Sequence, residues 1–455
     1  MTSWPWQALR YAAQNRERIL TELSEFASIP SISGDPVRGA DVRAAAEWMA
    51  HRFRVLELQR VEILETAGHP VVFAEAAAVG KPAATVMVYG HYDVQPPDPL
   101  GDWKTDPFTA TQVGDYLHAR GVSDMKGQII ACLAAVEAAV STGALPVTVK
   151  FVIEGEEEIG SPSFGSFLEK HRDLLSCDLV LNCDAGMLGS ECPTIVYGLR
   201  GMYECLLAVR GPVRDLHSGG FGGVVHNPIH ALSQVIAGFH DEAGRVAIPG
   251  FYDRVRPISS EEHEEMSRLP LDETFYMEQT GVRALWGEPG FLPAERVGAR
   301  PTLDVVQVKA GSPKSAIPAE ALALVTVRLV PDQDPDEIAA LFKRHVACHV
   351  PETVTWDIPE AWGYPPSITD RHSRGVRALA CALETVWSTP PVYHREGGSI
   401  NAVGEIQRVL GADSVLSGFS LPGDNVHGPN ERLHLPTWDR GIAALIHFLS
   451  NLASA

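Results

Sequence analysis

Hydrophobic residues follow two alternating patterns along the first part of the chain. Near-continuous apolar runs, rich in β-branched residues, predict buried strands at 84–89, 147–153 and 178–182. Apolar residues at helical spacing predict helices at 8–29, 41–57 and 127–140. Buried strands that alternate with helices are typical of a mostly parallel sheet with helices on both faces. We therefore predict an α/β domain here.

The hydrophobic pattern changes from about Leu199 onward. Residues 202–209 alternate between apolar and polar, as in a half-exposed strand, and a helix is expected to begin near Pro228. Further strands are predicted at 302–307 and 321–330, followed by a helix at 335–345. Strands with one exposed face are typical of a small two-layer α+β domain.

The α/β pattern returns after about Pro359, with helices predicted at 374–387 and 437–451. The chain should therefore contain one discontinuous α/β domain, formed by residues 1–198 and 361–455. An α+β domain is inserted into it at residues 199–360.

Composition narrows the class of protein. The 455 residues are 45% hydrophobic and 21% charged, as in ordinary globular proteins. The formal net charge of −20 argues against nucleic acid or an anionic membrane as a partner. Seven scattered cysteines without paired spacing favour a reducing compartment. The sequence shows neither a signal peptide nor an apolar stretch long enough to span a bilayer, so a cytoplasmic location is expected.

The run Glu156-Glu157-Glu158 follows the apolar stretch 147–153. Three adjacent acids repel one another, and burial disfavours their charged forms. A bound cation would relieve both costs, although an isolated run of this kind is also compatible with a solvated acidic turn.

Other possible metal ligands follow the neighbouring predicted strands. His91 ends one strand and Asp184 follows another, whereas Asp124 and His427 lie in turn-rich loops. Each alone has an ordinary explanation, such as a helix N-cap for Asp124. Together they should meet at one edge of the sheet, where ligands of α/β proteins collect. Strand alternation places Asp93 on the same side as His91, so that it can orient the imidazole.

Two imidazoles and several carboxylates form a donor set suited to Zn²⁺, Mn²⁺ or Co²⁺. One tetrahedral zinc cannot use all of these carboxylates, so the set favours two metal ions that share a bridging carboxylate. We therefore expect two divalent cations, with zinc as the first choice.

These residues form motifs that resemble the dinuclear zinc exopeptidase and deacylase family, which includes carnosinase-like dipeptidases, acetylornithine deacetylase and succinyl-diaminopimelate desuccinylase. The motifs are His91-x-Asp93, Gly121…Asp124-x-Lys126-Gly127, Glu156-Glu157-Glu158-x-Gly160-Ser161 and His427-x-x-Asn430-Glu431. The resemblance covers nearly the whole chain, including the inserted domain.

The resemblance implies a role for each residue of the predicted site. Asp124 would bridge the two metals; Glu158 and His427 would complete one metal site, and His91 and Asp184 the other. Glu157 would be the general base that acts on a metal-bridging water, with Asp93 orienting His91. Glu156 is left without a role, as a supporting or solvated residue.

In the inserted domain, the resemblance implies that His217 stabilises the oxyanion, often from across a dimer interface. Arg328 and Ser399 resemble residues that hold a substrate's C-terminal carboxylate, and Ser315 is a weaker candidate for the same task. Without the resemblance, Arg328 is equally compatible with a surface ion pair. Two positions depart from the family pattern: Met125 stands where a second acid is frequent, and Asn401 stands where proline is usual.

The resemblance implies a homodimeric metallopeptidase that hydrolyses dipeptides or short peptides. It also implies that the inserted domain acts as a lid and dimerisation domain. One alternative is an N-acyl amino-acid deacylase or desuccinylase, because its substrates also place an amide beside a free carboxylate. A second alternative is a non-catalytic metal-binding dimer.

Overall fold

A computed structural model describes residues 4–454. The chain forms two compact units. Among the described residues, unit 1 consists of residues 4–197, 369–394 and 400–454, and unit 2 of residues 198–368 and 395–399. The sequence analysis placed the inserted segment at 199–360. Unit 2 extends further because one strand, β14 (Thr355–Tyr364), ends beyond residue 360 and the next, β15 (Ser367–Ile368), pairs with Leu199.

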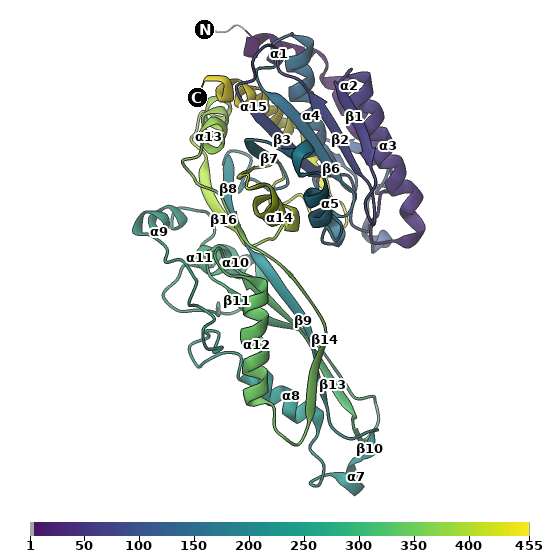
Figure 1. The fold of residues 1–455 in the computed structure, drawn as a ribbon, viewed down its shortest axis with the longest axis vertical. Coiled ribbons are helices and arrows are strands. Elements are labelled where there is room, and N and C mark those ends of the chain that lie inside the picture. Colours follow the sequence, from purple (N-terminus) through teal and green to yellow (C-terminus); the bar gives the residue numbers. More distant parts are fainter. Residues whose placement is uncertain (1–3, 455) are drawn as a thin grey trace. The chain divides into compact units, whose positions relative to one another are not determined.

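The elements of unit 1 are shown in Figure 1. Its helices are α1 (Trp4–Gln14), α2 (Arg16–Ala27), α3 (Gly39–Val55), α4 (Lys126–Ser141), α5 (Phe164–Lys170), α6 (Arg172–Leu175), α13 (Arg374–Trp387), α14 (Asn401–Leu410) and α15 (Leu435–Ser454), with 3-10 turns η1 (Pro36–Arg38), η2 (Leu100–Asp102) and η3 (Glu157–Ile159). Its strands are β1 (Arg60–Leu64), β2 (Val71–Ala76), β3 (Thr85–His91), β4 (Thr111–Val113), β5 (Tyr116–His118), β6 (Thr148–Glu154), β7 (Leu179–Asn182), β17 (Ser414–Leu416) and β18 (Arg432–His434). Two more strands, β8 (Thr194–Leu199) and β16 (Val392–Glu396), continue across the boundary.

The main sheet of unit 1 has the order β1-β2-β6-β3-β7-β17-β8. Its centre is parallel, because β3 pairs in parallel with β6 and β7, and β17 pairs in parallel with β7. One face packs against α3, α4, α13 and α15, and the other against α5 and α14. The predicted mostly parallel sheet with helices on both faces is confirmed.

One predicted helix, 8–29, is wrong as a single element. The structure has α1 and α2 instead, with a break at Asn15. Asn15 leaves the helical conformation, and its side-chain amide donates to Tyr11 O at 2.9 Å. Asparagine competes in this way with the helix for backbone hydrogen bonds.

Unit 2 is an antiparallel sheet with helices on one face. Its elements are β9 (Gly201–Arg210), β10 (Leu216–His217), α7 (Ser218–Phe221), α8 (Pro228–Ala237), α9 (Ser260–Met266), α10 (Glu273–Thr280), α11 (Pro293–Gly298), β11 (Thr302–Ala310), β12 (Ala316–Ile317), β13 (Glu320–Leu329), α12 (Pro335–His349), β14 (Thr355–Tyr364) and β15 (Ser367–Ile368). The sheet order is β11-β13-β9-β14, and α8 and α12 pack on one face. Asp334 caps α12 by accepting hydrogen bonds from Asp336 N and Glu337 N.

Among residues 4–454, no helix combines the length and the apolar character needed to cross a bilayer.

Candidate active site

The central parallel strands of unit 1 bring three predicted groups to one edge of the sheet. His91 is the last residue of β3, the Glu156–Glu158 run follows β6, and Asp184 follows β7. Because β6 and β7 both pair in parallel with β3, their carboxyl ends lie at the same edge. This is where ligands collect in α/β proteins.

Asp124 lies between the two predicted histidine ligands. Its Oδ1 is 3.1 Å from His91 Nε2, and its Oδ2 is 2.9 Å from His427 Nε2. Each histidine also has a second carboxylate neighbour: Asp184 lies 3.6 Å from His91 Nε2, and Glu158 lies 3.1 Å from His427 Nε2. The two oxygens of Asp124 therefore face two separate sets of donors.

Asp93 supports both His91 and the acidic run. His91 Nδ1 lies 3.1 Å from the backbone oxygen of Asp93 and 3.4 Å from its carboxylate. The carboxylate accepts hydrogen bonds from Glu157 N at 3.3 Å and Glu158 N at 3.0 Å. It therefore fixes the backbone of the two glutamates, which the sequence analysis did not foresee.

Glu157 and Glu158 have different surroundings although they are adjacent. The Glu158 carboxylate accepts from Gln95 N at 3.1 Å and from Gln95 Nε2 at 2.9 Å, besides its contact with His427. The Glu157 carboxylate stands 4.0 Å from His91 Nε2, outside hydrogen-bond distance. Gln95 is a site residue that the sequence analysis missed, because nothing in its local sequence marks it.

The solvated interpretation of Glu156 is wrong. Its residue exposure is 5%. A side-chain carbon on Gly68 would come within 1.7 Å of its Oε1, so the carboxylate fills the space that the glycine leaves. Glu156 is therefore buried against Gly68 rather than facing water.

Glu431 holds the loop that carries Asp124. Its buried carboxylate accepts from the backbone N–H groups of Gly121 at 2.9 Å, Ser123 at 2.9 Å and Asp124 at 3.1 Å. Arg120 Nη1 donates to it at 2.7 Å. Burial raises the pKa of Glu431 to about 7, although the Arg120 charge opposes this.

Arg120 connects this loop to the one that carries His427. Its Nη2 donates to Pro96 O at 3.2 Å and to Gly428 O at 3.1 Å. Arg120 and Glu431 were not among the predicted site residues. The signal for Glu431 was its place in the His427-x-x-Asn430-Glu431 motif.

The electrostatics of the cluster follow from its crowded carboxylates. Burial raises the pKa of Glu157, of Glu158 and of Asp184, the last to about 7. Hydrogen bonds to Asp124 and Glu158 raise the pKa of His427 to about 10. Burial alone would raise the pKa of Asp124, but its contacts with His427 and His91 hold it well below its usual value. The site is thus rich in negative charge that protons on histidine only partly offset.

These donors suit divalent cations. Two overlapping groups have ligand atoms within 4.8 Å of one another: His91, Asp124 and Glu158, and His91, Glu157 and Asp184. Carboxylate and imidazole donors are those of zinc, manganese and cobalt sites. The second group includes Glu157, so these distances alone do not distinguish a metal ligand from a general base. The assignment of Glu157 as the base therefore rests on the family pattern.

In unit 2, Arg328 and Ser399 lie together. Arg328 Nη1 donates to Ser399 Oγ at 2.9 Å. Ser315 lies elsewhere: it precedes β12 and contacts Ser218, beside His217, with Ser218 Oγ 3.2 Å from Ser315 O. The segment at His217 is not a plain loop, because β10 pairs with β12 and α7 follows. The end of unit 2 that carries His217 and the end that carries Arg328 are separated by the length of β13.

The two departures from the family pattern have structural roles. Met125 is buried in the core of unit 1 and leads into α4. Asn401 begins α14, and its Nδ2 donates to Gly160 O at 2.7 Å. It therefore anchors the turn that follows Glu158.

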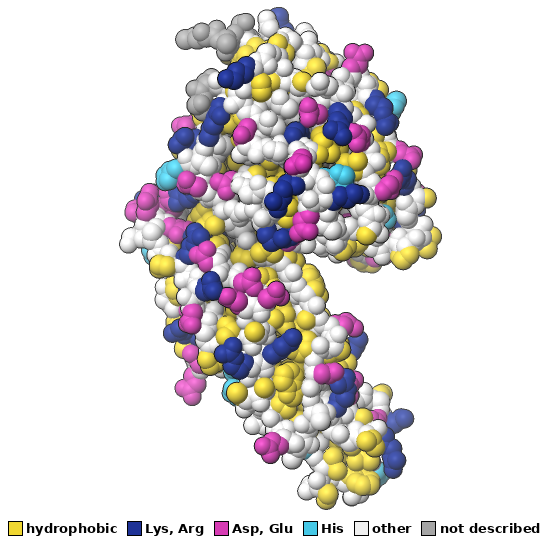
Figure 2. All heavy atoms as spheres, viewed as in Figure 1, with side chains coloured by type: hydrophobic (Ala, Val, Ile, Leu, Met, Phe, Trp, Pro, Cys, Tyr) yellow, Lys and Arg dark blue, Asp and Glu magenta, His cyan; other side chains and the backbone are white. Residues whose placement is uncertain are grey.

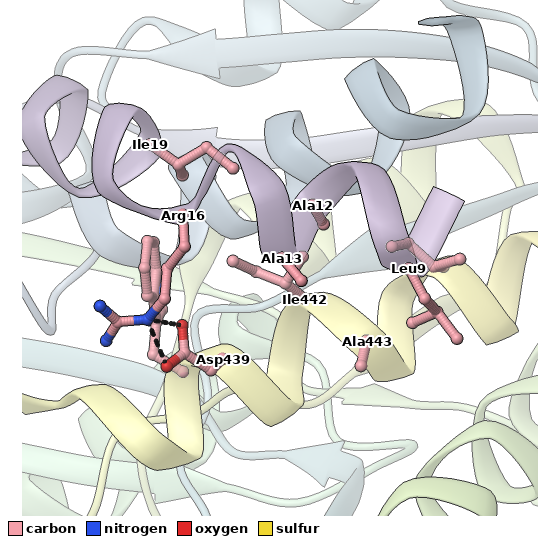
Figure 3. A pocket seen from close by; sticks show the side chains of 10 residues that line it. Leu9, Ala12, Ala13, Arg16, Ile19, Asp439, Ile442 and Ala443 are labelled. Carbon is pink, nitrogen blue, oxygen red and sulfur yellow. Dashed lines mark hydrogen bonds and ion pairs between the residues drawn. The ribbon is translucent and has the colours of Figure 1, made fainter. Parts of the chain in front are cut away.

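Unit 1 also has a pocket between α1 and α15, shown in Figure 3. Its walls are mainly apolar, and Arg16 pairs with Asp439 at 2.8 Å. It shares no residue with the acidic cluster, and we assign it no chemistry.

The sequence of the chain was compared with those of known protein families. Residues 87–451 match the sequence profile of "Peptidase family M20/M25/M40". The chain belongs to this family. The resemblance inferred from the motifs is therefore confirmed.

Individual M20 relatives cover most of the chain. It is 28% identical over 457 residues to the probable di- and tripeptidase DUG2 of Saccharomyces cerevisiae, covering 95% of this chain and 50% of that protein. The chain thus spans half the length of that relative. It is 28% identical to the human Beta-Ala-His dipeptidase, covering 84% of this chain and 78% of that one.

A solved structure shares the fold. The M20 family metallo-carboxypeptidase Sso-CP2 of Sulfolobus solfataricus superposes with a TM-score of 0.86 at 31% identity, covering 96% of this chain and 99% of that chain.

Proposed function

We propose that this M20 chain is a dipeptidase that uses two divalent cations, with zinc as the first expectation and manganese or cobalt as alternatives. Asp124 would hold both cations, Glu158 and His427 would complete one site, and His91 and Asp184 would complete the other. The contacts of Asp124 support this assignment most directly, because its two oxygens face two histidines at 3.1 and 2.9 Å.

When bound, the cations polarise the scissile carbonyl and lower the pKa of a water molecule toward neutrality. Residues of the chain itself transfer the proton and bind the substrate. Glu157 takes the proton of the attacking water on its carboxylate and passes it to the leaving amine nitrogen. Asp93 supports this step by fixing the backbone of Glu157 and the imidazole of His91. In the homodimer proposed below, His217 of one protomer would donate a hydrogen bond to the oxyanion that develops in the site of its partner.

Arg328 and Ser399 hold the free carboxylate of the substrate. A guanidinium suits this task because its planar donors match a carboxylate. Ser315 belongs, in this proposal, to the part of the site that carries His217. The names of relatives, a di- and tripeptidase and a Beta-Ala-His dipeptidase, support short peptides as substrates.

We also propose a homodimer formed through unit 2, the lid and dimerisation domain. Figure 2 shows hydrophobic side chains grouped at the end of unit 2 that carries β10 and α7. Val213 and Val224, which flank these elements, are 98% and 83% exposed. Large exposed apolar groups are typical of protein interfaces. Because all seven cysteines are free thiols, we place the enzyme in a reducing compartment, the cytoplasm.

The first test is a Glu157→Gln variant loaded with metal. It should retain two cations and lose hydrolysis of dipeptides by about two orders of magnitude or more, because a general base contributes that much. If the variant still hydrolyses dipeptides at the parent rate, Glu157 is not the general base. If the parent protein binds metal but hydrolyses neither dipeptides nor N-acyl amino acids, it is a non-catalytic metal-binding dimer.

A further inference from the structure

Arg200 lies beside Arg328 at one end of the sheet of unit 2. Thr302 is the strand partner of Arg328, and its Oγ1 accepts a hydrogen bond from Arg200 Nη1 at 3.5 Å. Arg200 Nε donates to Gly397 O at 2.9 Å, two residues before Ser399, which Arg328 contacts. Both guanidiniums therefore border the same short segment.

Neither Arg200 nor Arg328 forms an ion pair with a carboxylate among residues 4–454. Burial and the charge of Arg328 lower the pKa of Arg200 to about 10, and the charge of Asp304 opposes this without reaching ion-pair distance. Both arginines are half-buried. Like charges that are partly withdrawn from water without a counter-ion are costly, so this arrangement favours an anionic ligand.

Arg200 also lines a pocket of about 300 Å³ within unit 2, which we call the Arg200 pocket. Its walls include Tyr252, His240 and Trp286, whose rings supply apolar surface. His240 packs edge-on against Trp286, with ring centroids 5.0 Å apart. Trp286 is 67% exposed, so an apolar ring stands at the surface of the pocket.

The charged residues of the Arg200 pocket do not balance. Arg300 is committed to Glu288 through two hydrogen bonds of 2.7 and 2.8 Å. Arg296 also lines the pocket, and its buried Nε lacks a hydrogen-bond partner within the described chain. The charged side chains of the pocket that remain are Arg200, Arg296 and Asp304, and positive charge exceeds negative charge among them. One carboxylate would neutralise this excess.

We propose that the Arg200 pocket is the subsite for the side chain of the substrate's C-terminal residue, and that it selects an acidic side chain. The inference rests on the proposed function, in which Arg328 and Ser399 hold the α-carboxylate of that residue. Arg200 then meets the side-chain carboxylate, and the aromatic walls contact its methylene groups. Peptides that end in glutamate or aspartate are the preferred substrate class.

The test compares Ala-Glu with Ala-Gln, which have nearly the same shape but differ in charge. The metal-loaded enzyme should show a kcat/KM for Ala-Glu at least about tenfold above that for Ala-Gln, since a charge-assisted hydrogen bond provides a preference of this size. Arg200→Met should remove the preference by lowering kcat/KM for Ala-Glu alone. Arg200→Lys keeps the charge and should keep part of the preference. Arg210→Met, which removes a half-exposed arginine of the same unit that pairs with Glu320 and Asp357, is the matched control and should change neither value.

Two results would overturn the inference. One is an equal kcat/KM for the two dipeptides, and the other is an equal loss on both in Arg200→Met, which would show a merely structural role. If neither dipeptide is hydrolysed, the proposed function fails, and binding decides the inference separately. Calorimetry should then show L-glutamate bound about tenfold more tightly than L-glutamine by the parent protein but not by Arg200→Met; equal affinities would reject the subsite.

Discussion

The backbone N–H of Asp124 donates a hydrogen bond of 3.1 Å to the carboxylate of Glu431. Through this bond the proposed bridging ligand depends on a residue that does not itself face the cations. The same carboxylate receives Arg120, which reaches Gly428, next to His427. The two loops that supply Asp124 and His427 are thus joined through one buried ion pair.

Glu431→Gln should lower metal affinity by about tenfold or more, because groups that orient metal ligands contribute 10- to 100-fold. In this variant the NH₂ group of glutamine replaces one carboxylate oxygen. It would face backbone N–H groups that need a hydrogen-bond acceptor. Metal content after dialysis and calorimetric affinity measure the effect.

Loss of a buried ion pair also destabilises a fold, by about 3–5 kcal/mol, so a control must separate the two effects. Glu137→Gln is suitable, because Glu137 accepts from Arg52 at 2.6 Å in a similarly buried pair between α3 and α4. Both variants should unfold more easily, but only Glu431→Gln should lose metal. Equal metal loss in both would contradict the positioning role.

Metal binding should release protons. The pKa of His427 in the cation-free chain is raised to about 10 by Asp124 and Glu158, so at pH 7 its imidazole carries a proton. Ligation requires the neutral form, so the proton must leave and the apparent affinity must rise as pH rises from 6 to 8. Calorimetry in two buffers with different ionisation enthalpies measures the release. Identical heats in both buffers would contradict the assignment of His427 as a ligand.

Arg328→Met should raise KM for dipeptides and lower kcat/KM by about 10- to 100-fold, the value of a charge-assisted hydrogen bond to a carboxylate. The corresponding dipeptide amides lack that carboxylate and should be hydrolysed equally by parent and variant. Arg210→Met again serves as the control for loss of an arginine. An equal effect on amides and free dipeptides would show that Arg328 does not recognise the carboxylate.

The sequence analysis located the groups at strand ends because their positions follow from a parallel sheet. His91 and Asp184 could be placed near one another once β3 and β7 were recognised as buried neighbours. Gln95 and Arg120 could not, since their roles depend on which loops meet in space. Glu156 was misjudged for the same reason: its burial depends on Gly68, distant in sequence, which leaves room for the carboxylate.

In the inserted segment, local sequence patterns predict some features but not others. Its strands and the cap at Asp334 follow from local patterns, but the grouping of Ser315 does not. Ser315 was predicted as a weaker candidate for the same task as Arg328, whereas the pairing of β12 with β10 places it near His217. Pairing between distant short strands leaves little trace in local hydrophobicity.

Hydrolysis of a peptide bond beside a free amino group distinguishes a dipeptidase from a deacylase, and a pair of substrates measures it. The metal-loaded protein should be assayed with Ala-Glu and with N-acetyl-Glu, using Glu157→Gln as the control for contaminating activity. We predict that the dipeptide is hydrolysed, that N-acetyl-Glu is hydrolysed at least about tenfold more slowly, and that the variant hydrolyses neither. Hydrolysis of N-acetyl-Glu without hydrolysis of Ala-Glu would contradict the account and identify a deacylase instead.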